Sequence, residues 1–387
     1  TRVLLPLLLI LLSTGAAAVI AFGTHPGLAA HSARGLETIM LTRRLEWPLI
    51  LLCLVPCIIL LGLVITNKRR VWWLIGLAPV LGLFFHRFGP MRGHPMYILD
   101  EPIFVDAASD FAPHDEWWVV GVVFDDQAYA LPYWALWNMP VVFITDYDKR
   151  MMVMWSAQAN RATAYHVNRE FKARDLEFAS TPMDSPLIFD RRLGQFIVAV
   201  TGQTVQGQKP IGLGAPIETT RTTWTIWRKM HPKTKVLRGY ESSGEPVVPV
   251  LPSNKGAVVD GIPAETRIAV IGTNPPGATP SADAGQTPVN TTAGQVRVLL
   301  IRDPATGRLR AFDRNVNQDL FPTFAAKSDR RNPEIALIDA DSNSLWTIDG
   351  HAVEGPLKGS QLKEYPVEDD LYWGVMKYWY PQMTLAK

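Results

Sequence analysis

The sequence predicts a membrane-anchored α+β protein, in which three N-terminal transmembrane helices precede a β-rich extramembrane domain made of two related lobes. Three observations support this fold class: uncharged apolar runs before residue 90, strand and turn patterns after it, and an internal repeat. We therefore expect an anchor over residues 1–90, a first β-rich lobe over 91–245 and a second over 246–387.

The overall composition favours a membrane protein. Of the 387 residues, 48% are hydrophobic and only 19% are charged, whereas soluble proteins carry nearer ~25% charge. The net charge of +2 lacks the basic excess that marks nucleic-acid binding, so no nucleic-acid partner is expected. Two cysteines are too few for a disulfide scaffold or a four-cysteine metal site.

Three apolar runs form the expected anchor. Residues 3–22 and 48–66 contain no charge, and residues 71–86 follow with Trp72 and Trp73 as interface anchors. Each run approaches the ~20 residues that a bilayer span requires. The alternative for residues 3–22 is a cleaved signal peptide. A start at Thr1, as if only an initiator Met had been removed, favours a retained span.

The orientation follows from the basic residues beside these runs. The turn Asn67-Lys68-Arg69-Arg70 predicts a cytoplasmic loop, because such loops are enriched in Lys and Arg. Three spans then place the domain on the periplasmic side of a bacterial inner membrane. Arg34, Arg43 and Arg44 in the first loop oppose this orientation. Residues 33–44 would alternatively form an amphipathic helix along the interface.

Strand signals dominate after residue 90. Residues 117–124 read as a buried strand, and the segments 141–155 and 296–312 each read as a hairpin with a polar turn. Residues 241–256 and 272–295 are rich in Pro, Gly, Ser and Thr. These two stretches are expected to be loops or linkers.

An internal repeat links the two halves of this domain. Residues 190–237 and 339–384 share an Asp, two glycines, a Trp and a Pro in the same order, and the two hairpins also correspond. The pairs are Asp190 and Asp339, Gly202 and Gly350, Gly207 and Gly355, Trp224 and Trp373, and Pro232 and Pro381. We expect the glycines to form turns and each Trp to fill a lobe's core, within a short aromatic helix that ends at Pro.

The repeat contains no recognisable catalytic, cofactor or metal motif. Neither glycine pair precedes a phosphate-cradling helix. The run from Asp339 to Asn343 has the oxygen spacing that opens a calcium loop, but Ser344 and Gly350 occupy the positions of its Gly and Glu. An ordinary turn is therefore favoured there. We predict no catalytic, cofactor-binding or metal-binding residues.

Three segments resemble one bacterial family, domain of unknown function 3179. They are A-Y-A-L-P at 128–132, the glycine block that follows Asp190, and W-T-I-W-R-K-M-H-P-K-T-K-V-L at 224–237. The resemblance covers residues 95–240, and the closing motif recurs at 350–384. It implies an exported or membrane-anchored protein. In many members a cysteine motif after one strand, with a His-Glu pair before it, suggests thiol redox chemistry.

This chain departs from the family where that chemistry would lie. The strand at 141–144 is followed by T-D-Y-D-K-R and preceded by L-W-N-M-P, and both cysteines, Cys53 and Cys57, lie in the second apolar run. Since a thiolate is the nucleophile in such chemistry, the activity is not transferred. The two cysteines are expected to pack inside a helix.

The sequence therefore favours a non-catalytic accessory subunit that braces partner subunits of a membrane complex, photosynthetic or respiratory, beside the lipid bilayer. Four aromatic residues are candidate interface anchors: Trp134, Trp137, Tyr378 and Trp379. One alternative is a redox-type or other enzyme with a site between the lobes that uses Asp146, Asp148, His166 or His231. Another is a cell-wall or carbohydrate binder that uses the tryptophans.

Overall fold

The computed structural model describes residues 3–32, 34–66, 68–88, 96–239, 245–281, 287–304, 307–317, 320–327 and 335–386. The chain forms two compact units. The first comprises Thr1–Ser156, Ala162–Trp224 and Lys233–Val248, and the second comprises Ala157–Arg161, Thr225–Pro232 and Pro249–Lys387. Each unit therefore includes residues from separate parts of the sequence.

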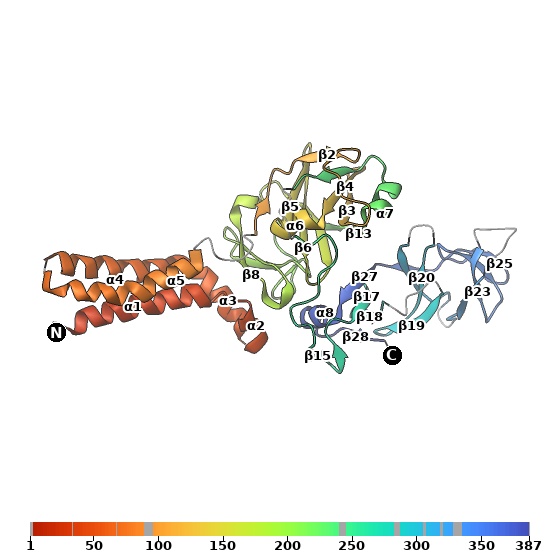
Figure 1. Cartoon of the computed structure of the whole chain (residues 1–387). Helices are drawn as coiled ribbons and strands as arrows, with labels where there is room; N and C mark the ends of the chain where they lie inside the picture. Colours follow the sequence, from red (N-terminus) through yellow and green to blue (C-terminus); the bar gives the residue numbers. More distant parts are fainter. Residues whose placement is uncertain are drawn as a thin grey trace. The chain divides into compact units, whose positions relative to one another are not determined.

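Two helices of the described chain, α1 (Leu4–Phe22) and α4 (Glu46–Thr66), are long and apolar enough to cross a bilayer. They pack against each other and, with α5, form a bundle (Figure 1). Ser13, Ala16 and Ala17 are buried in α1, and such small side chains allow membrane helices to approach closely. Most large aliphatic side chains of both helices point outward, as lipid contact requires.

The third apolar run does not form one long helix. It is divided into a 3₁₀-helix, η1 (Lys68–Leu77), and an α-helix, α5 (Ala78–Phe88), of 11 residues. Pro79 lies in the first turn of α5, where its missing N–H is tolerated, and η1 ends two residues before it. The expected third span is therefore not confirmed. Trp73 is half-buried in η1, whereas Asn67 and the side chains of residues 68–72, including Trp72, lie outside the described residues.

The loop between α1 and α4 is helical and contacts the first β-rich sheets. It contains α2 (Gly27–His31) and α3 (Gly35–Arg44), and α3 matches the helix expected over residues 33–44. Arg43 forms ion pairs with Glu46 and with Glu177 on β8 (Leu176–Ser180). Ser180 Oγ donates a hydrogen bond of 2.7 Å to the carbonyl of Thr24.

The first unit contains three sheets. One has the order β13-β3-β4-β14-β2, with bounds Thr219–Thr223, Trp118–Phe124, Gln127–Pro132, Lys235–Leu237 and Phe104–Asp106. The second has the order β1-β5-β6-β7-β12, with bounds Ile98–Leu99, Val141–Asp146, Lys149–Ser156, Arg161–Val167 and Leu213–Ile217. The third has the order β11-β10-β9-β8, in which β9 to β11 span Leu187–Asp190, Gln195–Val198 and Gln203–Thr204.

The described part of the second unit has three sheets of four strands each. It also has a small ribbon of β15 (Val258–Val259) and β16 (Ile262–Pro263). The order β27-β17-β18-β28 has bounds Val367–Tyr372, Arg267–Ile271, Gly277–Pro280 and Thr384–Leu385. The order β19-β20-β21-β26 has bounds Val289–Ala293, Val296–Arg302, Leu309–Asp313 and Glu364–Tyr365. The order β22-β23-β24-β25 has bounds Phe324–Ala326, Ile335–Asp339, Leu345–Thr347 and Ala352–Glu354.

The same strand arrangement occurs twice along the chain. In the order β13-β3-β4-β14 the pairings are antiparallel, antiparallel and parallel, and β27-β17-β18-β28 repeats them. The order β8 to β11 likewise matches β22 to β25, and Asp190 and Asp339 end equivalent strands. Both copies thus place the repeated sequence motifs on equivalent elements.

The expected hairpins form, but their correspondence is shifted by one strand. Strands β5 and β6 pair antiparallel, as do β20 and β21. The strands β12 and β26 form the same edge of the two sheets. Counted from that edge, β7 matches β21, β6 matches β20 and β5 matches β19, so the β5-β6 hairpin corresponds to β19-β20. The expected loop 272–295 accordingly contains β18 and β19. Their polar and glycine-rich sequences lack the usual strand signal. They are strands because their backbone groups form hydrogen bonds with β17 and β20.

Short helices complete the two copies. They are α6 (Tyr133–Asn138), α7 (Trp224–Met230), α8 (Trp373–Trp379) and the 3₁₀ turns η2 (Ala173–Asp175) and η3 (Pro182–Asp184). The N–H of Trp224 donates to the carbonyl of Trp117 at 2.7 Å, and the N–H of Trp373 donates to Thr266 at 2.9 Å. Each acceptor lies just before a central strand, so both helices begin at the same point of the repeat.

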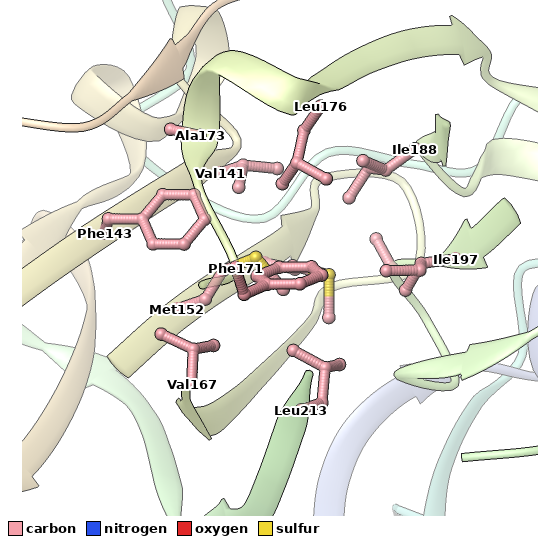
Figure 2. Close-up of a cluster of buried hydrophobic side chains, with 12 residues drawn as sticks. Val141, Phe143, Met152, Val167, Phe171, Ala173, Leu176, Ile188, Ile197 and Leu213 are labelled. Carbon is pink, nitrogen blue, oxygen red and sulfur yellow. The ribbon is translucent and has the colours of Figure 1, made fainter. Parts of the chain in front are cut away.

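One apolar core cluster of the first unit lies between its second and third sheets. Figure 2 shows Val141, Phe143 and Met152 facing Ile188 and Ile197, with Phe171 and Leu176 between them. Most of these side chains are fully covered. In the described part of the second unit, one apolar cluster lies around Leu300 and Ala311 and another around Phe312 and Trp346.

Candidate functional site

The repeated glycines and tryptophans occupy structural positions. Gly202, Gly207, Gly350 and Gly355 all have positive φ angles, between 66° and 92°. A Cβ on Gly202 would also overlap the ring of Tyr165. Trp224 and Trp373 are each only 1% exposed. Pro232 and Pro381 are exposed in the turns that follow α7 and α8.

The repeated aspartates organise turns. Asp190 accepts hydrogen bonds from the backbone N–H groups of Arg192 and Leu193, at 3.0 and 3.1 Å. Asp339 is completely buried and accepts from the N–H of Ser342 at 2.6 Å and the indole N–H of Trp346 at 3.0 Å. The run that begins at Asp339 is therefore an Asp turn bonded to a core tryptophan, as the sequence favoured over a calcium loop.

Replacing Asp339 with alanine should destabilise the sheet β22-β23-β24-β25. The buried indole N–H of Trp346 would lose its acceptor, and an unsatisfied buried donor costs about 1–3 kcal/mol. Hydrogen exchange of β23 and β24 in the full chain would measure the loss. Asp341→Ala is the control, because Asp341 is exposed and accepts one bond from the Thr323 N–H. Equal protection in Asp339→Ala and wild type would contradict this role.

The β5-β6 turn joins β5 to β6 through Tyr147 and Asp148. Tyr147 is 97% exposed at its tip and has a φ of 50°. Lys149 forms an ion pair with Asp125, and Asp148 lies 3.9 Å from Arg169. Burial, Asp146 and Asp125 all raise the pKa of Tyr129. This is a solvated charged turn on a tight hairpin.

The two histidines considered for catalysis lie in different units. His166 is exposed on β7 of the first unit, and its ring centroid is 5.5 Å from that of Phe124. His231 ends α7 within a segment of the second unit, where its ring centroid is 4.2 Å from that of Trp227. Burial lowers the pKa of His231. The backbone N–H of His231 donates to the carbonyl of Trp227 at 2.8 Å. The backbone N–H of Tyr380 makes the equivalent bond to the carbonyl of Met376.

The four aromatic interface candidates differ in exposure. Trp134 is only 5% exposed, so its expected place on an interface is wrong. Helix α6 has six residues, and the sequence of so short an element does not reveal which face is covered. Trp137, Tyr378 and Trp379 are half-buried. The ring centroids of Tyr378 and Trp379 lie 5.0 Å apart, edge to face.

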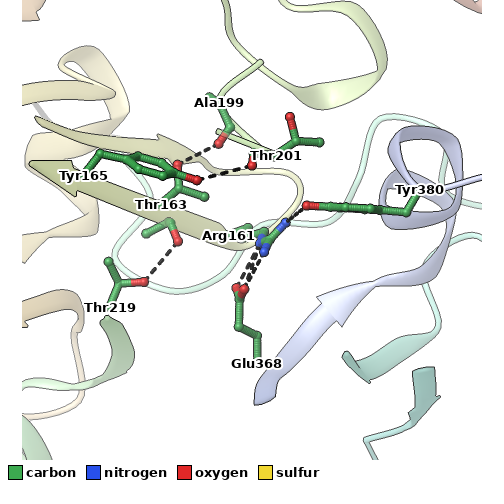
Figure 3. Close-up of polar contacts among 9 residues, drawn as sticks. Arg161, Thr163, Tyr165, Ala199, Thr201, Thr219, Glu368 and Tyr380 are labelled. Atoms are coloured by element: carbon green, nitrogen blue, oxygen red, sulfur yellow. Dashed lines mark hydrogen bonds and ion pairs between the residues drawn. The ribbon is translucent and has the colours of Figure 1, made fainter. Parts of the chain in front are cut away.

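The sequence did not indicate a charged cluster in the second unit (Figure 3). Arg161 Nε lies 2.9 and 3.1 Å from the carboxylate oxygens of Glu368, and its Nη1 donates to the Tyr380 hydroxyl at 2.7 Å. Only 12% of the Arg161 side chain is exposed. Burial by itself lowers the pKa of Arg161, but Glu368 and Tyr380 outweigh it and raise the pKa above its usual value.

The sequence also did not indicate the cluster of Arg43, Glu46 and Glu177. Arg43 and Glu46 are only three positions apart, but Glu177 lies far along the chain. No local pattern signals the Arg43–Glu177 or the Arg161–Glu368 pair, because any arginine has many carboxylates at similar separations. Among the described residues, no three His, Cys, Asp or Glu side chains come together as metal ligands would. Cys53 is buried and Cys57 half-buried in α4, and the thiol of Cys57 lies 3.4 Å from the hydroxyl of Ser13.

A family model described as "Protein of unknown function (DUF3179)" matches residues 97–383. The match includes both copies of the repeat and begins after the apolar helices. No curated protein and no solved structure matches the chain.

Proposed function

This chain belongs to the family described as "Protein of unknown function (DUF3179)", and from that premise we propose that it is a non-catalytic accessory subunit of a membrane-protein complex. Its apolar helices would anchor it in a bacterial inner membrane, and its duplicated β-rich lobes would brace partner subunits on the periplasmic face. The observation that carries this proposal is the Arg43 ion-pair cluster, which fastens the loop between two apolar helices to the first β-rich sheets.

This fastening favours a bracing role because it restricts movement between anchor and sheets. The Arg43 side chain is only 9% exposed and lies between the carboxylates of Glu46 and Glu177. A covered pair of this kind resists separation more than a solvated one does. Arg44 adds a bond of 3.0 Å to the carbonyl of Gly194, on the turn between β9 and β10. A lobe held in this way would keep a fixed distance from the membrane.

The same contact supports three passes. Since the α1–α4 loop lies against the first sheets, α4 leads the chain to the far end of the bundle at Thr66. The chain must then return to reach β1. From Val71 to Phe88, η1 and α5 would together extend about 30 Å at ~2.0 and ~1.5 Å per residue, which matches a hydrocarbon core of ~30 Å. Arg43 and Arg44 are engaged by the lobe, which leaves the turn at 67–70 as the cytoplasmic signal.

The repeat motifs also suit a scaffold better than the alternatives. Their buried Trp and Asp residues and their positive-φ Gly residues build each copy's turns and core. A carbohydrate binder would need exposed tryptophans, whereas Trp134, Trp224 and Trp373 are covered. An enzyme that uses Asp146, Asp148, His166 or His231 remains a rival with a simple test. Asp146→Asn and His231→Phe variants that lose a function that the wild type supports would favour it.

The subunit proposal is tested by purification from native membranes in mild detergent. We expect the chain to migrate within an assembly of fixed stoichiometry, and native mass spectrometry would report the partner masses. Migration as a free monomer under conditions that preserve other membrane complexes would overturn the proposal.

A substitution at Arg43 tests whether the fastening matters for assembly. Arg43→Gln would leave Glu177 and Glu46 without their shared cation, so we expect faster protease cleavage in the loop 23–45 and less assembled complex. Arg34→Gln is the matched control, because Arg34 is an exposed arginine of the same loop. Equal cleavage and assembly in the two variants would show that the ion pairs do not couple anchor and lobe.

A further inference from the structure

A pocket of about 410 Å³ lies in the first unit beside the point where the chain leaves the apolar helices. Its walls come from Met96 to Asp100, around β1, and from Ala173 to Phe178, around η2 and β8. This volume falls within the range of ~300–1,000 Å³ typical of small-molecule sites.

The pocket adjoins the loop between α1 and α4. Glu177 lines it and is also the residue that Arg43 of α3 holds. Another part of its lining begins at Met96, eight positions after Phe88, the last residue of α5. The pocket therefore lies beside the α1–α4 loop and is lined by residues that follow the third apolar segment in sequence. In a protein anchored by these helices, that position is the membrane surface.

The lining divides into an apolar floor and a charged rim. Ile98, Leu176 and Phe178 belong to or pack against the core cluster around Phe143 and Phe171, shown in Figure 2. Met96 and Tyr97 are 38% and 57% exposed, which leaves apolar surface open at the mouth. Tyrosine is one of the two residues enriched at membrane interfaces.

Among the described residues that line the pocket, Arg174 is the only cation. Asp100 is paired with Arg150, and Glu177 is paired with Arg43 and with Arg191, the latter at 2.9 Å. Arg174 also lines the pocket, and its guanidinium is exposed with no carboxylate partner among the described residues. Arginine matches the geometry of a phosphate group with two parallel donors. An apolar floor next to such a group suits an amphipathic phosphate ester.

We propose that this pocket binds one glycerophospholipid of the outer leaflet. The lipid phosphate pairs with Arg174, and the first part of an acyl chain covers Met96, Ile98 and Phe178. This inference rests on the proposed membrane anchoring and adds a lipid that seals the lobe onto the bilayer.

Photocrosslinking of the full chain tests the proposal. The chain is reconstituted in vesicles of phosphatidylglycerol and phosphatidylethanolamine that contain a phosphatidylglycerol with a diazirine on its acyl chain. We expect labelled peptides from residues 96–100 and 173–178. Arg174→Gln should lower this labelling about tenfold, because a charged hydrogen-bonded contact to the phosphate is lost. Tyr97→Ala, at an exposed position, should lower it as well.

The control is Arg192→Gln, an exposed arginine of the same unit that does not line the pocket. Equal labelling of residues 173–178 in Arg174→Gln and Arg192→Gln, or labelling confined to α1, α4 and α5, would overturn the lipid site. Carbonate extraction of native membranes separates the two proposals. Release of the wild-type chain by carbonate would refute the anchoring itself, whereas retention with unaltered labelling in Arg174→Gln refutes only the pocket.

Discussion

Replacing Trp373 with alanine is expected to lower the free energy of unfolding of the second unit by about 3–5 kcal/mol. Trp373 is 1% exposed at the start of α8, and its indole N–H donates to the carbonyl of Val259 at 2.9 Å. The substitution removes the buried ring and leaves that carbonyl without its donor. Hydrogen exchange in the full chain of β27, which contacts α8, and of its partner β17 would measure the loss.

Trp379→Ala is the matched control, because Trp379 ends the same helix but is half-buried. We expect it to cost much less, and Trp373→Phe to fall between the two. Trp224→Ala should reproduce the effect of Trp373→Ala on strand β3 of the first unit if the two copies use the tryptophan in the same way. Full protection of β17 in Trp373→Ala would show that the ring is not a core element.

Removing Arg161 is expected to have the second largest effect. Arg161→Leu would leave the Glu368 carboxylate without its cation and Tyr380 without its donor. Breaking a buried ion pair from one side costs ~3–5 kcal/mol, and the 31% exposure of Glu368 reduces this to about 2–3 kcal/mol. Reduced hydrogen-exchange protection of β27, where Glu368 lies, would report the loss.

Two further variants identify the cause of this loss. The double variant Arg161→Leu/Glu368→Leu should recover part of the stability, since it removes the orphaned charge. Arg267→Gln breaks a more exposed ion pair, in which Arg267 lies 3.5 Å from Asp370, a residue of the same strand as Glu368. This variant should cost at most ~1 kcal/mol. If Arg161→Leu cost no more than Arg267→Gln, the cluster in Figure 3 would be dispensable for the fold.

Local patterns were sufficient for much of the architecture. Apolar runs without charge marked α1 and α4, and polar turns between alternating segments marked the β5-β6 and β20-β21 hairpins. The glycine and tryptophan repeat identified turns with positive φ and buried rings. Strand β19, which reads V-N-T-T-A, escaped detection because its polar residues carry no strand signal without the neighbour that pairs with it.

Whether a feature of this protein could be predicted depends on how far apart its interacting residues lie in the sequence. Helix length, hairpin turns and turn glycines depend on residues a few positions apart, so composition and spacing are enough to predict them. Trp134 was misplaced, the pairing of Arg43 with Glu177 was not foreseen, and Arg161 and Arg174 went unnoticed, because their surroundings come from distant segments: Arg161 and Glu368 are 207 positions apart. Only the folded chain decides which arginine meets a carboxylate, which one is left to meet a ligand, and which tryptophan is covered.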